Sequence, residues 1–162
     1  MASTLYTNAT IITVNHERHV IRDGWIHVVG NLIAAIGPTS NIKSKLDKPT
    51  NTKIVSLHGK IVIPGLINVH AHLIQSLIRG LAEGMPLHNW ACDTIWPMEA
   101  AFENEDGYIA AKLTMAEMLK TGTTCFLEPM LPVQAGLENI SRAVGEVGIR
   151  ACLVRFPKHA FM

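Results

Sequence analysis

The sequence lacks features that would place it in three classes of protein. It has no apolar run of the roughly 18 residues that a membrane-spanning helix needs, so we expect no membrane segment. Neither sign of charge dominates, because 14 lysines and arginines accompany 13 acidic residues. The net charge of +1 provides no basic surface for nucleic acid. The first residues carry no basic stretch before an apolar core, so no secretory leader is expected.

Cysteine is scarce, and its positions are scattered. Cys92, Cys125 and Cys152 form no Cys-x-x-C pair, which argues against a zinc ribbon and a thioredoxin-like redox site. Their apolar surroundings are typical of reduced cysteines in a core. Reduced cysteines suit the cytoplasm, where we expect the protein to act.

What the chain does contain is a globular composition with two successive patterns. It is 48% hydrophobic and 17% charged over 162 residues, which is enough for a real core. Residues 1–60 carry short β patterns, with a hairpin turn at Gly30-Asn31 and a polar connection over residues 38–53. From residue 61, strand and helix patterns alternate, which implies parallel strands with right-handed crossovers.

Two histidines stand at the end of the first strand of this second region, expected over residues 61–69. His70 and His72 are two residues apart, and side chains at i and i+2 of a strand point to the same side. Their imidazoles can therefore converge on one metal ion, since imidazole is a common ligand of zinc, iron and nickel. Taken alone, such a pair is more typical of two solvated histidines than of a metal site.

The histidine pair is part of a longer pattern. In residues 59–80 an apolar strand leads into Pro-Gly, an apolar pair, Asn, one further residue and then His-x-His. This pattern resembles the first barrel strand of the amidohydrolase superfamily. Further motifs resemble its branch of methylthioadenosine/S-adenosylhomocysteine deaminases and s-triazine hydrolases; these are residues 85–90, 95–99, 118–124 and 148–155.

The resemblance implies an α/β fold with two parts. Residues 1–60 would form part of a small β-sandwich, which in the family is completed by strands from the far C-terminus. Residues 61–162 would form the first strands and helices of a TIM-like (β/α)₈ metal-dependent hydrolase barrel. A whole barrel takes about 250 residues, so a chain of 162 residues is expected to hold an incomplete barrel.

The resemblance also implies roles for individual residues. His70 and His72 would be metal ligands, with zinc favoured and iron as the alternative. The family's other ligands and its proton-transferring glutamate come later, so no catalytic residue is expected up to Met162. Glu99 resembles a glutamate that contacts ribose hydroxyls, and Arg155 resembles an arginine that reaches the amino-acid end of the substrate.

Each of these further residues also has an ordinary interpretation. Glu99 and Arg155 are equally compatible with exposed surface charges. Trp90 would either line a pocket for a flat ring or pack between a lid and the barrel. Glu128 ends the predicted strand over residues 123–127, at a position where the nucleoside deaminases usually have aspartate and the triazine hydrolases vary more. It is either a functional residue or a polar residue where the strand meets solvent.

The combined interpretation is a metal-dependent hydrolase of the deaminase type. It would act on a non-peptide carbon–nitrogen bond of a heteroaromatic small molecule, namely a thionucleoside, purine, pyrimidine or triazine. No nucleic acid or membrane partner is expected, and a homo-oligomer is compatible with the sequence. The alternative is a truncated, catalytically inactive fragment of such an enzyme.

Overall fold

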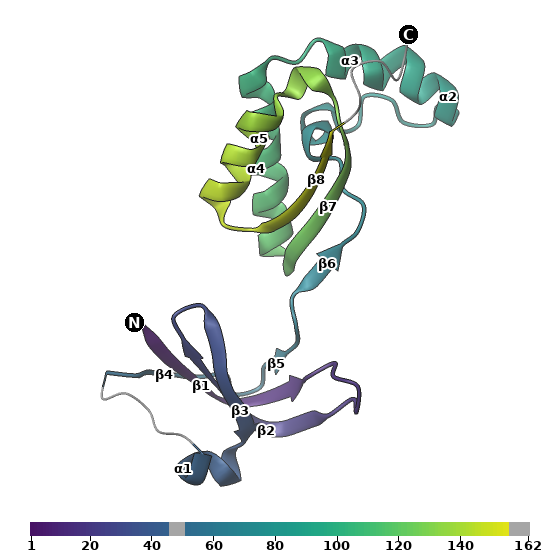
Figure 1. Ribbon diagram of the computed structural model, residues 1–162. Coiled ribbons are helices and arrows are strands. Elements are labelled where there is room, and N and C mark those ends of the chain that lie inside the picture. The colour runs from purple at the N-terminus through teal and green to yellow at the C-terminus, as the bar shows by residue number, and fades with distance from the viewer. Residues whose placement is uncertain (46–50, 156–162) are drawn as a thin grey trace. The chain divides into compact units, whose positions relative to one another are not determined.

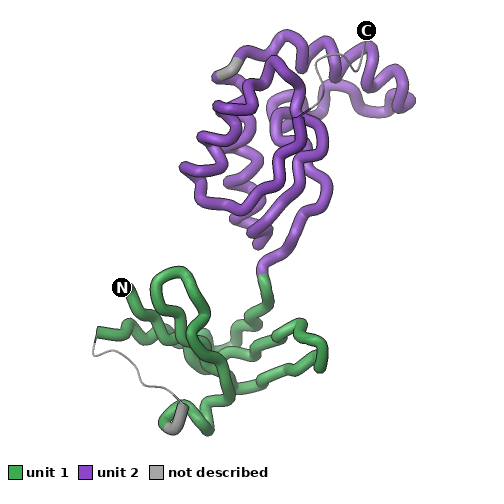
Figure 2. The backbone as a smooth tube through the Cα atoms, viewed as in Figure 1, with its two compact units in different colours: residues 1–64 green, residues 65–162 purple. Residues whose placement is uncertain are grey.

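The computed structural model describes residues 1–45 and 51–155, and the chain divides into two compact units. Figure 2 colours them separately, as residues 1–64 and residues 65–162. The predicted polar connection lies partly outside the described residues. Within the described ranges, no helix combines the length and the apolar character that crossing a membrane requires.

The first unit is built on one sheet. Its described strands lie in the order β3-β2-β1-β4, and β5 also pairs with β1 (Figure 1). β2 runs antiparallel to β1 and β3, whereas β4 and β5 run parallel to β1. The predicted hairpin turn is present, with Gly30 at a φ of 61°. The elements are β1 (Ser3–Ile12), β2 (Val20–Val29), β3 (Leu32–Pro38), the short helices η1 (Thr39–Asn41) and α1 (Ile42–Lys45), β4 (Lys53–Ser56) and β5 (Ile61–Val62).

Residues 61 and 62 belong to this first sheet, which corrects their predicted place in the first barrel strand. Ile61 pairs with Thr10 and Val62 pairs with Ile11. The extended chain is then interrupted at Pro64, whose missing N–H makes it a poor residue inside a sheet. The strand of the second unit therefore begins only at Leu66.

The second unit is a parallel sheet with helices packed on it. Its described strands lie in the order β6-β7-β8, and α4 and α5 lie side by side along this sheet (Figure 1). The elements are β6 (Leu66–Asn68), η2 (Leu73–Ile78), α2 (Leu87–Asn89), the π-helix η3 (Trp90–Ile95), α3 (Trp96–Ala100), α4 (Asn104–Lys120), β7 (Thr123–Leu131), η4 (Val133–Ala135), α5 (Leu137–Val147) and β8 (Arg150–Arg155).

Apolar side chains from α4, α5 and β7 form the core of this unit. Met115 of α4, Phe126 of β7 and Ile140 of α5 are all buried in one cluster. α4 begins with a capping box, in which the side chains of Glu103 and Asp106 each accept a hydrogen bond from the backbone N–H of the other residue. This packing holds β7 and β8 in place, and their carboxyl ends are where barrel folds place their functional groups.

The contact between α4 and η4 gives a stability prediction. A Cβ on Gly107 would lie 2.3 Å from the carbonyl oxygen of Ala135. Because this is a backbone atom, no side-chain rotation can relieve the clash. We expect Gly107→Ala to destabilise the fold by about 1–3 kcal/mol, the usual cost of overpacking.

Gly145→Ala in α5 is the matched control for this prediction. A Cβ there meets nothing within 4 Å, and alanine favours a helix over glycine by about 0.8–1 kcal/mol. Urea unfolding of both variants, made in the product of the complete reading frame, should therefore give changes of opposite sign. An equal loss of unfolding free energy in both variants would contradict the close contact between α4 and η4.

Candidate metal and substrate site

The two histidines follow β6, as their predicted position at the end of the strand implies, but the strand ends at Asn68, one residue earlier than expected. Asn68, the last residue of β6, turns the chain by accepting a hydrogen bond from the His70 N–H at 3.1 Å. Pairing with β7 nevertheless continues, because the Ala71 N–H donates to the Leu127 carbonyl at 2.9 Å. The segment that carries both histidines is thus anchored to the neighbouring strand.

The imidazole rings of the pair face one another. The Nε2 atoms of His70 and His72 are 3.1 Å apart, and the rings are nearly perpendicular, with centroids 4.9 Å apart. This is the convergence that the i, i+2 spacing predicts. At this separation the two nitrogens form a hydrogen bond, in which the tautomers decide which Nε2 donates.

The geometry of the pair fits two ligands of a divalent metal. At metal–nitrogen distances of about 2.0–2.1 Å, two nitrogens at corners of a tetrahedron are about 3.3 Å apart. The observed separation of 3.1 Å needs only a small adjustment to match. Among the described residues, no group of three or more His, Cys, Asp or Glu side chains is placed to hold a metal.

Glu128 supports the second histidine from inside the protein. β7 continues to Leu131 rather than ending near Leu127, which corrects the predicted end of the strand. Glu128 therefore lies within the strand, 1% exposed, and the interpretation of a solvent-meeting polar residue is wrong. Its Oε1 lies 3.4 Å from Nδ1 of His72. The pairing of β7 with β8 is irregular between Glu128 and Leu131, a stretch that contains Pro129.

This carboxylate also alters the acid–base behaviour of His72. The hydrogen-bonding contact with Glu128 raises the pKa of His72, and the opposing effect of burial is smaller. A metal must take the nitrogen in its unprotonated form. A metal held by this nitrogen would therefore compete with protons at a higher pH than at an ordinary histidine.

Glu99 lies in the same neighbourhood. It belongs to α3 and is 8% exposed, so the alternative of an exposed acidic residue is wrong. The side-chain amide of Gln75 donates to its Oε1 at 2.8 Å. Burial raises the pKa of Glu99, while the hydrogen bond from Gln75 and the charge of His72 lower it. Glu99 and Glu128 both act electrostatically on the pKa of His72, and His72 and Glu128 act on the pKa of Glu99, so Glu99 lies within electrostatic range of the histidine.

In the described part of the chain, Trp90 and Arg155 form no recorded contact with the two histidines. Trp90 begins the π-helix η3 and is half-buried. Arg155 is exposed at the end of β8, where it pairs in register with Leu131. Within the described residues, no hydrogen bond or ion pair joins either side chain to the histidine pair.

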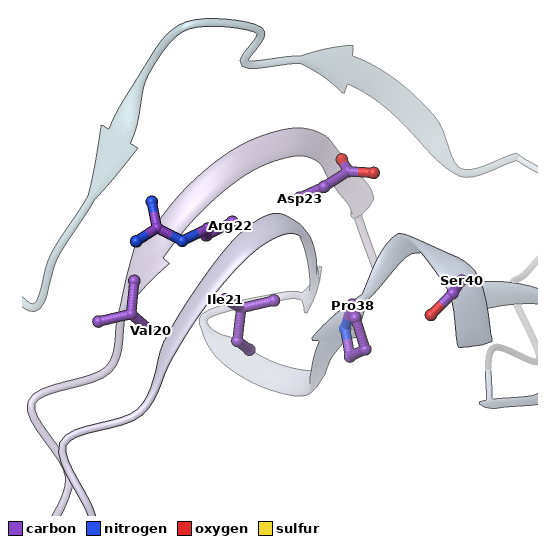
Figure 3. Close-up of a pocket in the computed structure, with 6 residues that line it drawn as sticks. All are labelled: Val20, Ile21, Arg22, Asp23, Pro38 and Ser40. Carbon is purple, nitrogen blue, oxygen red and sulfur yellow. The ribbon is translucent and has the colours of Figure 1, made fainter.

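A separate pocket of about 480 Å³ lies in the first unit (Figure 3). One of its side chains, Asp23, accepts a hydrogen bond from the Thr39 hydroxyl at 3.0 Å. The residues that line it are Val20, Ile21, Arg22, Asp23, Pro38 and Ser40. None of them was singled out from the sequence, and they contain no metal-ligating cluster.

Comparisons with known proteins give consistent results. A family described as "Amidohydrolase family" matches residues 61–158. A 5-methylthioadenosine/S-adenosylhomocysteine deaminase of Pelotomaculum thermopropionicum is 36% identical over 155 residues, covering 96% of this chain and 34% of the relative. The chain thus spans about a third of the length of that relative.

Solved structures share the fold. A triazine hydrolase from Arthobacter aurescens superposes with a TM-score of 0.80 at 23% identity, over 96% of this chain and 36% of its own. An adenosine deaminase from Xanthomonas campestris, solved with bound zinc, has a TM-score of 0.70 at 28% identity, over 93% of this chain and 33% of its own. In both cases the match again covers about a third of the solved chain.

Proposed function

The chain belongs to the amidohydrolase family, and from this premise we propose that it forms the first part of a metal-dependent hydrolase that deaminates a heteroaromatic small molecule. The family and the fold class predicted from the sequence are confirmed. The observation that carries the proposal is the convergence of the two Nε2 atoms of His70 and His72.

In this proposal the histidine pair holds the metal. His70 and His72 would bind it through Nε2, and the Glu128 carboxylate would contact the opposite nitrogen, Nδ1, of the His72 ring. Zinc is the proposed metal, with iron as the alternative; the bound zinc of the Xanthomonas campestris structure supports this choice. The chemistry that such a metal supplies when bound is activation of water as a nucleophile at neutral pH.

Three residues are proposed to meet the substrate. Glu99 is supported best, because it is buried and shares the electrostatic environment of His72. Its carboxylate would accept two hydrogen bonds from a vicinal diol. Arg155, at the end of β8, would bind a carboxylate with its planar guanidinium group, and Trp90 would contact a flat ring. The last two roles rest on sequence resemblance alone.

The proposed substrates are thionucleosides first, and other purines, pyrimidines or triazines second. The names of the relatives, which include an S-adenosylhomocysteine deaminase and a triazine hydrolase, support this range. A cytoplasmic location and a homo-oligomeric state remain predictions. The experiment that tests the function is an ammonia-release assay with methylthioadenosine, S-adenosylhomocysteine, guanine and an amino-triazine, using the product of the complete reading frame after loading with zinc.

A second candidate is that the 162-residue chain is itself catalytically inactive. It is favoured because no group of three or more potential metal ligands lies together among the described residues, and because the chain spans a third of the length of the relative. We expect the isolated 162-residue chain to release no measurable ammonia from any of these substrates, with zinc, iron or manganese added. Loss of general acid–base catalysis alone costs about 10²–10⁴-fold. Clear turnover by the isolated chain would refute this candidate and show that the missing groups come from elsewhere, for example from a second chain.

A further inference from the structure

Glu128 is a charged side chain placed where a charge is costly. It is 1% exposed, and an isolated carboxylate in such a place would be strongly unfavourable unless hydrogen-bonded. Two backbone N–H groups meet this need. Leu73 donates to Oε2 at 2.7 Å, and Met130 donates to Oε1 at 2.9 Å.

The same carboxylate faces the ring of His72. Its Oε1 lies 3.4 Å from Nδ1. Because both carboxylate oxygens already accept from backbone N–H groups, Nδ1 meets an acceptor and is favoured as the protonated nitrogen. In a neutral imidazole only one nitrogen carries a proton. The lone pair is then on Nε2, the atom that lies 3.1 Å from Nε2 of His70.

We propose that Glu128 is a positioning residue, which fixes the tautomer and the ring orientation of His72 so that the Nε2 lone pair points to the metal position. This inference rests on the proposed metal site and deepens it. Carboxylates that orient metal-binding histidines act in this way in many proteins. Glu128 itself would touch neither the metal nor the substrate.

A purely structural role is the competing explanation. Glu128 also ties η2 to β7 through the N–H of Leu73, and this alone would justify its burial. A structural role predicts a loss of stability when Glu128 is changed. It does not predict a change in which nitrogen of His72 carries the proton, and this difference separates the two explanations.

The deciding measurement is the ¹⁵N NMR spectrum of the His72 ring. It is recorded on the metal-free product of the complete reading frame, at a pH where His72 is neutral. We expect the proton on Nδ1 in the parent protein. In Glu128→Gln the side-chain NH₂ can donate to Nδ1, so the proton should move to Nε2. A parent protein with the proton on Nε2, or a folded variant with an unchanged tautomer, would overturn the proposal.

Metal affinity provides the second readout. Competition with a chelator should show zinc bound about 10–100-fold more weakly by Glu128→Gln than by the parent protein. Glu117→Gln is the control, because Glu117 is a half-exposed carboxylate on α4 that pairs with Arg79 at 2.9 Å and is not among the groups that act on His72. It should keep nearly all of the parent affinity, and an equal loss in both variants would contradict a specific role for Glu128.

The two claims can fail separately. A parent protein that binds no zinc would refute the proposed function, while the tautomer of its His72 would still decide the role of Glu128. If Glu128→Gln does not fold, the tautomer of the parent protein alone decides. A proton on Nδ1 supports the proposal, and a proton on Nε2 refutes it.

Discussion

Replacing both His70 and His72 with asparagine should reduce the bound metal in the product of the complete reading frame to background. Turnover should fall by more than the roughly 10²–10³-fold that loss of a single preorganised hydrogen-bond donor costs, because the activated water is lost with the metal. The physical basis is the 3.1 Å separation of the two Nε2 atoms, which neither asparagine would reproduce. Elemental analysis and the ammonia-release assay check the two outcomes.

His58→Asn is the control for this double variant. His58 is exposed in the first unit, without ligand spacing to another histidine. It should retain the metal content and activity of the parent protein. Retention of stoichiometric metal by the His70/His72 double variant would show that the ion is bound elsewhere.

Glu99→Gln should lower kcat/KM for nucleoside substrates and leave kcat/KM for substrates without ribose nearly unchanged. A hydrogen bond to a charged group is worth about 1.5–3 kcal/mol, so kcat/KM for methylthioadenosine or S-adenosylhomocysteine should fall about 10–100-fold. Guanine and an amino-triazine have no ribose, so their kcat/KM should change little. Steady-state kinetics with both substrate types checks this.

The matched control for Glu99 is Glu117→Gln. Glu117 is a half-exposed carboxylate on α4, paired with Arg79 at 2.9 Å. Its loss should leave both substrate types unaffected, because an exposed ion pair contributes little. An equal fall for ribosylated and ribose-free substrates in Glu99→Gln would remove the proposed diol contact.

The histidine pair and the strand–helix alternation are features that the sequence alone could predict. Both follow from spacing. The i, i+2 spacing of His70 and His72 predicts that the two imidazoles share one side, although the structure brings them together after β6, where Asn68 turns the chain. The helix patterns that end before Gly122 and Gly148 follow from the 3.6-residue period. Both glycines have positive φ in the structure, 91° and 75°, as helix-ending residues often do.

The sequence did not predict that Glu128 is buried, because its burial depends on contacts with residues far away in the chain. Locally, a glutamate followed by Pro129 reads as a strand end. In the structure β7 tolerates the proline through an irregular register and continues to Leu131. The donors that satisfy the carboxylate include Leu73, which is 55 residues away in the chain. The one local signal for it is that apolar residues flank the charged residue at the end of the predicted strand.

Glu99 and Ile61 show two further properties that the sequence could not determine, the burial of a side chain and the pairing of a strand. The sequence placed Glu99 by resemblance and could not decide between a buried and an exposed side chain; the hydrogen bond from Gln75 decides for burial. Ile61 was assigned to the barrel because it extends an apolar run. Its partner Thr10 lies in the first sheet, and strand pairing of this kind leaves no mark on hydrophobic spacing.

A zinc-soaked crystal of the product of the complete reading frame, with anomalous data collected at the zinc edge, tests the central claim most directly. The account predicts one anomalous peak about 2.0–2.1 Å from Nε2 of both His70 and His72, with Nδ1 of His72 still turned toward Glu128. A protein that takes up zinc at other residues, with the two imidazoles unliganded, would contradict it.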